Sequence, residues 1–135
     1  METLKIKTRK ERDVVDITDA VNKALKRHPP RGEIVHLFVK HTTAALTTVP
    51  LRSTDGLDIM GVMEATVHHP SHPRDGVGGN SHYMTRLPAA IVAAHIGASL
   101  ALPVRRGRLS LGRFQKAVLL EFEGPGTREV VVISE

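Results

Sequence analysis

Short stretches of alternating apolar and polar residues recur along the chain, and this alternation is typical of β-strands with one buried face. In the first stretch, Leu4 and Ile6 alternate with Lys5 and Lys7. Residues 124–126, Gly-Pro-Gly, predict a turn that joins the last two stretches. The predicted strands cover residues 3–8, 14–17, 33–40, 44–49, 101–104, 109–122 and 128–134.

Helices are predicted where apolar residues recur every three or four positions. Val21, Ala24 and Leu25 share one face of a segment that should end before the following Pro-Pro pair, because a residue that precedes proline avoids the helical region. An oxygen from Asp16 or Thr18 would cap its start. Two or three helices beside these strands place the chain in the α+β class. The other predicted helices cover residues 56–69 and 87–100, the second of them with a cap near Gly97. Residues 68–80 are predicted to form a long loop.

Length and composition narrow the class of protein further. With 135 residues, the chain is predicted to form a single domain over residues 1–135. Apolar residues make up 41% and charged residues 24%, which is ordinary for a globular protein, and no apolar run is long enough to span a membrane. The first residues lack the apolar core of a signal peptide and the chain has no cysteine, so we expect a cytoplasmic protein without disulfides or thiolate chemistry.

The net charge of +5 suggests an anionic partner. Nucleic-acid-binding modules usually present stacking aromatic side chains, yet this chain has three Phe, one Tyr and no Trp. A small phosphorylated ligand is therefore expected in preference to nucleic acid. The densest cluster of positive charge, Arg105, Arg106 and Arg108, falls in a predicted turn, where it is either a solvated loop or a grip for phosphate.

Residues 38–48 combine the side chains that most suggest chemistry. An apolar strand leads into His41, Thr42 and Thr43. Imidazole can carry a proton, bind a metal or pair with phosphate, and neighbouring hydroxyl groups can orient an oxyanion. The alternative is a strand end at which these side chains only satisfy their own backbone.

Other candidates for ligand contacts lie farther along the chain. Arg113 could donate to an anion, and Gln115 could hold a ring nitrogen or a carbonyl, although it could equally be a solvent-facing strand residue. The glycine-rich run that ends at Asn80 could bring backbone N–H groups close to a phosphate. Several of the eight histidines fall at predicted strand ends or in loops, but their spacing matches no local zinc motif, so any metal site would be assembled by the fold.

Two motifs together carry a family resemblance: His-Thr-Thr-Ala-Ala-Leu, which begins at His41, and Leu-Gly-Arg-Phe-Gln, which ends at Gln115. With the Gly-Asn of residues 79–80 and the Ile-Gly-Ala-Ser of residues 96–99, they resemble the YjbQ family, also called the secondary thiamine-phosphate synthase family. The resemblance extends over nearly the whole chain. It departs from the family pattern at residues 49–50, where Val-Pro replaces the usual Asn-Glu and removes a carboxylate from the expected site.

The resemblance implies a compact α+β domain with a β-sandwich-like core of mixed sheets, assembled as a homotrimer with sites near the subunit boundaries. It also implies a thiamine-phosphate synthase-type transferase of low activity, which joins a pyrimidine methyl diphosphate to a thiazole phosphate. Either a divalent metal such as Mg²⁺ or Zn²⁺ or cationic side chains would stabilise the departing pyrophosphate. The expected catalytic residues are His41, Arg113 and Gln115, the substrate-binding residues are Thr42, Thr43, Gly112 and Asn80, and the metal ligands are His41, His69 and His82.

Two other functions stay open from the sequence. The protein could bind a phosphorylated small metabolite without turning it over, and the missing carboxylate at residues 49–50 favours this reading. Nucleic-acid binding through residues 105–108 would follow from charge alone.

Overall fold

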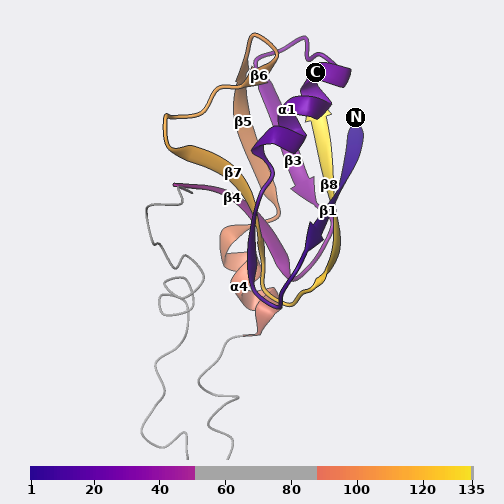
Figure 1. The fold of residues 1–135 in the computed structure, drawn as a ribbon, viewed down its shortest axis with the longest axis vertical. Helices are drawn as coiled ribbons and strands as arrows, with labels where there is room; N and C mark the ends of the chain where they lie inside the picture. The colour runs from indigo at the N-terminus through magenta and orange to yellow at the C-terminus, as the bar shows by residue number, and fades with distance from the viewer. Residues whose placement is uncertain (51–87, 135) are drawn as a thin grey trace, which may run out of the picture.

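The computed structural model describes residues 1–50 and 88–134, which form eight β-strands and two α-helices (Figure 1). Five strands make one sheet in the order β1-β8-β3-β5-β6, and three make a second sheet in the order β2-β7-β4. Every strand pair in this part of the chain is antiparallel, and the α+β class is confirmed. The elements are β1 Glu2–Thr8, β2 Asp13–Asp16, α1 Thr18–Arg27, β3 Ile34–Val39, β4 Ala44–Pro50, α4 Ala89–Ile96, β5 Ser99–Arg105, β6 Arg108–Leu109, β7 Gln115–Glu121 and β8 Gly126–Ser134.

The five-stranded sheet has one buried and one exposed face, as the alternating sequence predicts. In β3, Val35, Leu37 and Val39 are buried, whereas the residues between them are exposed. The buried face packs against α1, whose Val21 and Leu25 belong to the same apolar cluster. Burial of this face supplies the main favourable free energy for folding, because it removes large aliphatic side chains from water.

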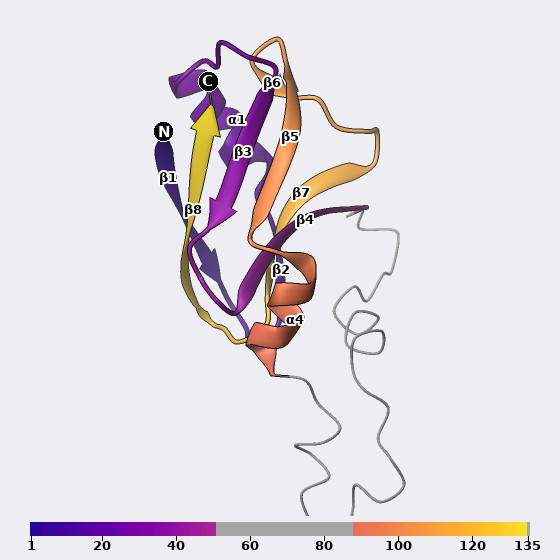
Figure 2. The ribbon, with the colours of Figure 1, turned by 180° about the vertical axis from the view of Figure 1, so that it is seen from behind.

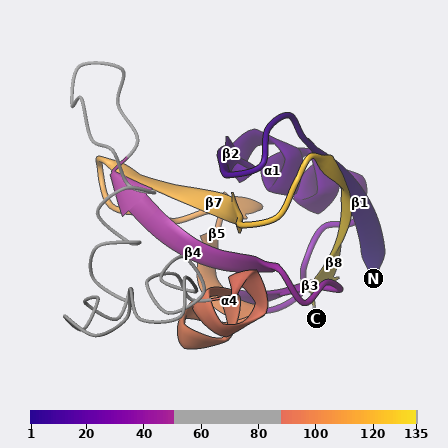
Figure 3. The same ribbon diagram turned by 90° about the horizontal axis from the view of Figure 1, so that it is seen from below.

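The three-stranded sheet is apolar on both faces. One face of β4 and β7 joins the main core through Leu46 and Leu119, and the other packs through Ala45 and Leu120 against α4. Figure 3 shows α1 and α4 on opposite sides of these strands. Burial on both faces explains why β7 reads as a continuous apolar run rather than an alternating one.

Several predicted boundaries shift in the structure. The helix predicted for residues 87–100 ends at Ile96, at the cap predicted near Gly97, which adopts a φ of 109°, and the chain then enters β5 at Ser99 (Figure 2). The strand predicted for residues 109–122 is interrupted between Leu109 and Gln115. The first helix follows Ile17, and its first N–H, from Thr18, is held by the carboxylate of Asp16 at 2.9 Å.

The helix of residues 56–69 and the loop of residues 68–80 lie outside the described residues. Neither α1 nor α4 is long and apolar enough to cross a membrane, and no other helix is found in the part of the chain that the structure describes.

Candidate functional site

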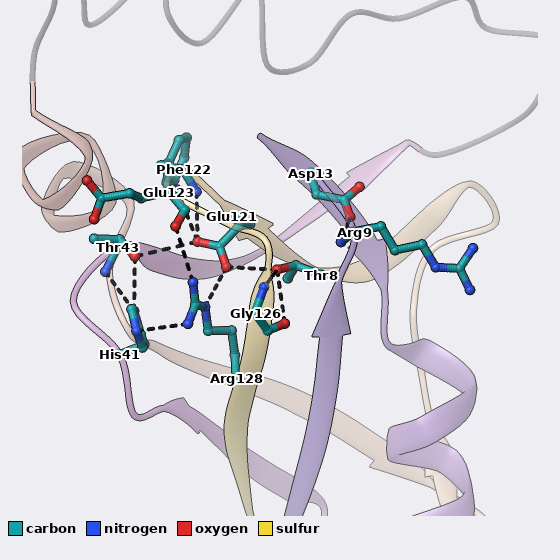
Figure 4. A network of polar contacts seen from close by, with 10 residues as sticks. All are labelled: Thr8, Arg9, Asp13, His41, Thr43, Glu121, Phe122, Glu123, Gly126 and Arg128. Carbon is teal, nitrogen blue, oxygen red and sulfur yellow. Dashed lines mark hydrogen bonds and ion pairs between the residues drawn. The ribbon is translucent and has the colours of Figure 1, made fainter. Parts of the chain in front are cut away.

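His41 lies in the short connection between β3 and β4, at the end of the five-stranded sheet where β1 finishes and β8 begins (Figure 1). Its ring is half-buried and contacts two other residues (Figure 4). Nδ1 lies 3.0 Å from the hydroxyl oxygen of Thr43 and 3.2 Å from the Thr43 backbone nitrogen, and Nε2 lies 3.0 Å from Nη1 of Arg128. Both ring nitrogens are therefore engaged.

Both ring nitrogens of His41 face hydrogen-bond donors. Nε2 faces the guanidinium group of Arg128, which can only donate, and Nδ1 faces the backbone N–H and the hydroxyl group of Thr43. That hydroxyl can in turn donate to Oε2 of Glu121, 3.5 Å away. A chain of hydrogen bonds thus joins His41 to a buried carboxylate.

Glu121 is the best-connected side chain of this region. It is 0% exposed, and a buried carboxylate is stable only when it is paired and hydrogen-bonded. Its oxygens accept from Nε of Arg128 at 2.5 Å, from the Thr8 hydroxyl at 3.1 Å, and from the backbone N–H groups of Phe122 and Glu123 at 3.1 and 3.2 Å. With every acceptor position occupied by a donor, Glu121 holds the other side chains in place.

Arg128 connects the carboxylate to the histidine. Beyond its contacts to Glu121 and His41, Nη2 donates weakly to the carbonyl oxygen of Glu123 at 3.4 Å. A guanidinium carries five N–H groups, so at least two have no partner among the described residues. Gly126 makes room for this arrangement, because a Cβ there would lie 2.8 Å from Nη1. Arg128 and the Nε2 edge of His41 could therefore receive an anionic oxygen and exchange a proton with it.

We call Thr8, His41, Thr43, Glu121 and Arg128 the Glu121 network. Thr8 and Arg128 occupy inward-facing positions at the ends of β1 and β8, and Glu121 is the last residue of β7. The network thus joins strand ends of both sheets (Figure 4).

Gln115 and Gly112 form a second polar cluster, which we call the Gln115 cluster. The amide oxygen of Gln115 accepts from the N–H of Gly112 at 2.8 Å, and its amide nitrogen lies 3.4 Å from the hydroxyl oxygen of Thr48. A Cβ at residue 112 would lie 2.9 Å from that amide oxygen, so glycine permits the close approach. Arg113 follows directly, with its guanidinium carbon 5.2 Å from the centroid of the Phe114 ring.

The two clusters lie at opposite ends of the same pair of strands. Ala44 pairs with Glu121 at one end of the β4–β7 ladder, and Pro50 pairs with Gln115 at the other. Six residue steps along a strand span roughly 20 Å. Within one chain, the structure therefore does not bring His41 together with Arg113 and Gln115. The Val-Pro of residues 49–50 lies at the Gln115 end, so the carboxylate missing there would not have faced His41.

The remaining predicted site residues divide into two groups. Thr42 is exposed, whereas its neighbour Thr43 is buried in the Glu121 network. Asn80, His69 and His82 lie outside the described residues, so the metal set of His41, His69 and His82 stays a prediction. Within residues 1–50 and 88–134, no three histidine, aspartate or glutamate side chains are grouped closely enough to hold a metal ion.

The sequence reasoning missed three members of the network, namely Thr8, Glu121 and Arg128. A signal for Glu121 was present, because it is the charged residue in the otherwise apolar run Ala-Val-Leu-Leu-Glu-Phe that ends at Phe122. A carboxylate in a fully buried strand requires a cationic partner. The sequence did not say which of the chain's nineteen Lys and Arg residues would be that partner.

Comparisons with known proteins agree with this fold over its full length. The family model described as "UPF0047 protein YjbQ-like" matches residues 2–134. A UPF0047 protein of Archaeoglobus fulgidus is 35% identical over 132 residues, which cover 96% of each chain. The UPF0047 protein YugU of Bacillus subtilis is 30% identical, and the match covers 95% of this chain and 93% of YugU. Among solved structures, the conserved hypothetical protein TT1486 from Thermus thermophilus is 34% identical with a TM-score of 0.77, and each chain is covered completely. The chain therefore belongs to the YjbQ (UPF0047) family.

Proposed function

We propose that the protein is a transferase of the thiamine-phosphate synthase type, and that its reacting groups meet at the Glu121 network. In the reaction, the bond between the pyrimidine methyl carbon and the diphosphate oxygen breaks, the thiazole nitrogen bonds to that carbon, and pyrophosphate leaves. The observation that carries the proposal is the pairing of His41 Nε2 with Arg128 above the buried Glu121.

Each member of the network has a role in this proposal. Arg128 donates its unpartnered N–H groups to the leaving pyrophosphate, whose negative charge rises as the bond breaks. His41 handles the proton that pyrophosphate takes up on leaving. Glu121 touches no substrate, and it positions Arg128 through the contact at Nε. These roles belong to the protein's own side chains, and the metal set of His41, His69 and His82 stays a prediction.

Arg113 and Gln115 act in the same reaction in this proposal, as the diphosphate-binding and substrate-orienting residues. Groups that act on one reacting pair must lie within a few ångströms of it, which the separation along the β4–β7 ladder prevents within one chain. We therefore propose that the Gln115 cluster of one copy faces the Glu121 network of a neighbouring copy in a homotrimer.

The exposed face of the five-stranded sheet supports an assembly. Ile34, Phe38 and Ile133 project from it and are 51%, 43% and 39% exposed. Phe38 pairs across the strands with Val131, and Ile133 lies two residues farther along the same face of β8, so these apolar side chains are contiguous. No described helix or strand covers them, and an exposed apolar patch of this kind is typical of a protein–protein interface.

A non-catalytic function is the second candidate. Because both ring nitrogens of His41 already have partners, proton transfer requires Arg128 to move, whereas binding of an anion does not. In that case the protein binds a phosphorylated metabolite through the same side chains without turning it over.

The test measures turnover and binding on the same samples. Purified protein is incubated with the two phosphorylated substrates, thiamine phosphate is quantified by mass spectrometry, and binding of each substrate is followed by calorimetry. The transferase proposal expects product from the wild type and none from His41→Ala. Binding without product would favour the second candidate, and absence of both would reject the two together.

His41→Ala also separates a functional histidine from a structural one. It removes two contacts at the edge of the core, so we expect it to lower the free energy of unfolding by about 1–2 kcal/mol while the protein remains folded. A folded His41→Ala variant that binds and reacts like the wild type would mean that this histidine only supports the fold.

The site between copies has its own test. His41→Ala and Gln115→Ala are co-expressed with different tags and isolated as mixed assemblies. If each site uses His41 from one copy and Gln115 from the next, about one site in three of every mixed trimer regains both residues and activity returns in proportion. If one chain supplies both residues, every site in the mixture keeps a defect and no activity returns.

A further inference from the structure

A groove between α1 and the β5–β6 turn carries a dense positive charge that the proposed function does not use. It encloses about 480 Å³, which is within the range of small-molecule sites. The lining residues are Asp19, Asn22, Lys23 and Lys26 from α1, and Arg106, Gly107 and Arg108 from the turn. We call this the basic groove. Figure 1 shows α1 and β6 at the end of the fold opposite to the one where β1 finishes and β8 begins, so the groove is separate from the Glu121 network.

The two walls of the basic groove are tied together. The side-chain oxygen of Asn22, in the middle of α1, accepts from the backbone N–H of Leu109 in β6 at 2.8 Å. A bond between a helix and a turn that are far apart in sequence fixes the distance between the cations on the two sides. The groove is therefore formed before any ligand arrives, which lowers the entropy cost of binding.

The turn itself has an unusual sequence for its backbone. Arg106 and Gly107 connect β5 to β6 with φ angles of 55° and 73°, as in a type I′ turn. Glycine, asparagine and aspartate are preferred at positive φ, and an arginine there is strained. The strained arginine lines the groove, which suggests that its charge is needed at this place.

The charges of the lining favour a multivalent anion. Four cationic side chains face one carboxylate, that of Asp19, which leaves a net charge of +3 by the difference of four and one. None of the four forms an ion pair with another residue of the described ranges. Like charges held this close repel one another, and an anion between them would remove the repulsion.

We propose that the basic groove binds an anion with two linked phosphoryl groups, such as a diphosphate ester or pyrophosphate. A phosphoryl group carries a charge of about −1.5 to −2, so two of them match the lining. The lining contains no aromatic side chain on which a nucleobase could stack. Single-stranded nucleic acid could therefore contact the groove only through its own phosphate groups. The site is independent of the reaction proposed above.

The experiment titrates pyrophosphate into ¹⁵N-labelled protein and follows the amide signals of Gly107 and Leu109, with calorimetry for the affinity. Arg106→Asn removes the charge and keeps a residue that a type I′ turn prefers, so the variant should fold at least as well as the wild type. We expect its affinity for pyrophosphate at the groove to fall about tenfold or more, since charge-assisted hydrogen bonds to phosphate are among the strongest in proteins. Arg9→Gln, which removes one exposed charge outside the groove, is the matched control and should bind like the wild type.

The outcomes separate this proposal from the previous one. His41→Ala should leave the shifts of Gly107 and Leu109 unchanged, because His41 does not line the groove. Unperturbed groove signals at millimolar pyrophosphate, or an Arg106→Asn variant with wild-type affinity, would overturn the proposal. So would an oligonucleotide that binds more tightly than pyrophosphate with a steep salt dependence, since that result would assign the groove to nucleic acid.

Discussion

Replacing Arg128 by methionine should destabilise the protein through the charge that it leaves behind. Methionine keeps much of the apolar bulk of the side chain but removes the cation 2.5 Å from a carboxylate that is 0% exposed. Removal of one partner from a buried ion pair costs about 3–5 kcal/mol. Glu121 keeps the donors from Thr8, Phe122 and Glu123, so the expected loss lies near the lower limit, at about 3 kcal/mol.

Urea denaturation at one fixed protein concentration measures this loss, and a thermal scan of the same samples measures the change in the midpoint. At about 3–4 °C per kcal/mol for a chain of this length, the thermal midpoint of Arg128→Met should fall by about 10 °C near neutral pH. Glu121→Gln combined with Arg128→Met should lose less than the sum of the single variants, because no charge is then left unpaired. A loss below about 1 kcal/mol would refute the role assigned to the pair.

Three further predictions concern other parts of the fold. Phe38→Glu should dissociate the expected trimer, because it places a charge in the contiguous apolar patch. Lys5→Glu, on edge strand β1, should leave the trimer intact. Light scattering that finds a monomeric wild type would contradict this expectation. Gly124→Ala should lower the free energy of unfolding by about 1–3 kcal/mol in urea titrations, because the added Cβ would lie 2.6 Å from a backbone carbonyl oxygen. An unchanged free energy of unfolding would contradict the close packing at this glycine. Arg27 donates to Glu2 and holds the pKa of that carboxyl below its ordinary value. The pair therefore stabilises the folded state at a pH above the ordinary pKa, and this stabilisation is lost as the pH falls through the lowered pKa. Glu2→Gln should therefore flatten the acid side of the stability curve, less so in high salt, and an unchanged curve at low salt would argue against the pair.

Local signals in the sequence predicted most of the elements near their observed places. Alternation identified β1 and β3 because one face of each is buried and the other is exposed. The cap predicted near Gly97 is confirmed, since α4 ends at Ile96. The prediction of one strand over residues 109–122 was wrong, because the segment between Leu109 and Gln115 leaves the sheet.

The sequence by itself identified the family, the α+β class and the position of His41 at a strand end, because these depend on residue type and on spacing along the chain. Only the tertiary structure decided what surrounds that histidine. Arg128 and Glu121 lie about eighty positions or more beyond His41 in the chain. The register of β7 against β4 places Glu121 at the end of the ladder near His41, and it places Gln115 at the opposite end. A carboxylate in an apolar strand predicts, from the sequence alone, that some cationic side chain pairs with it. Which Lys or Arg side chain this is depends on how the strands pair, and no local sequence pattern specifies that pairing.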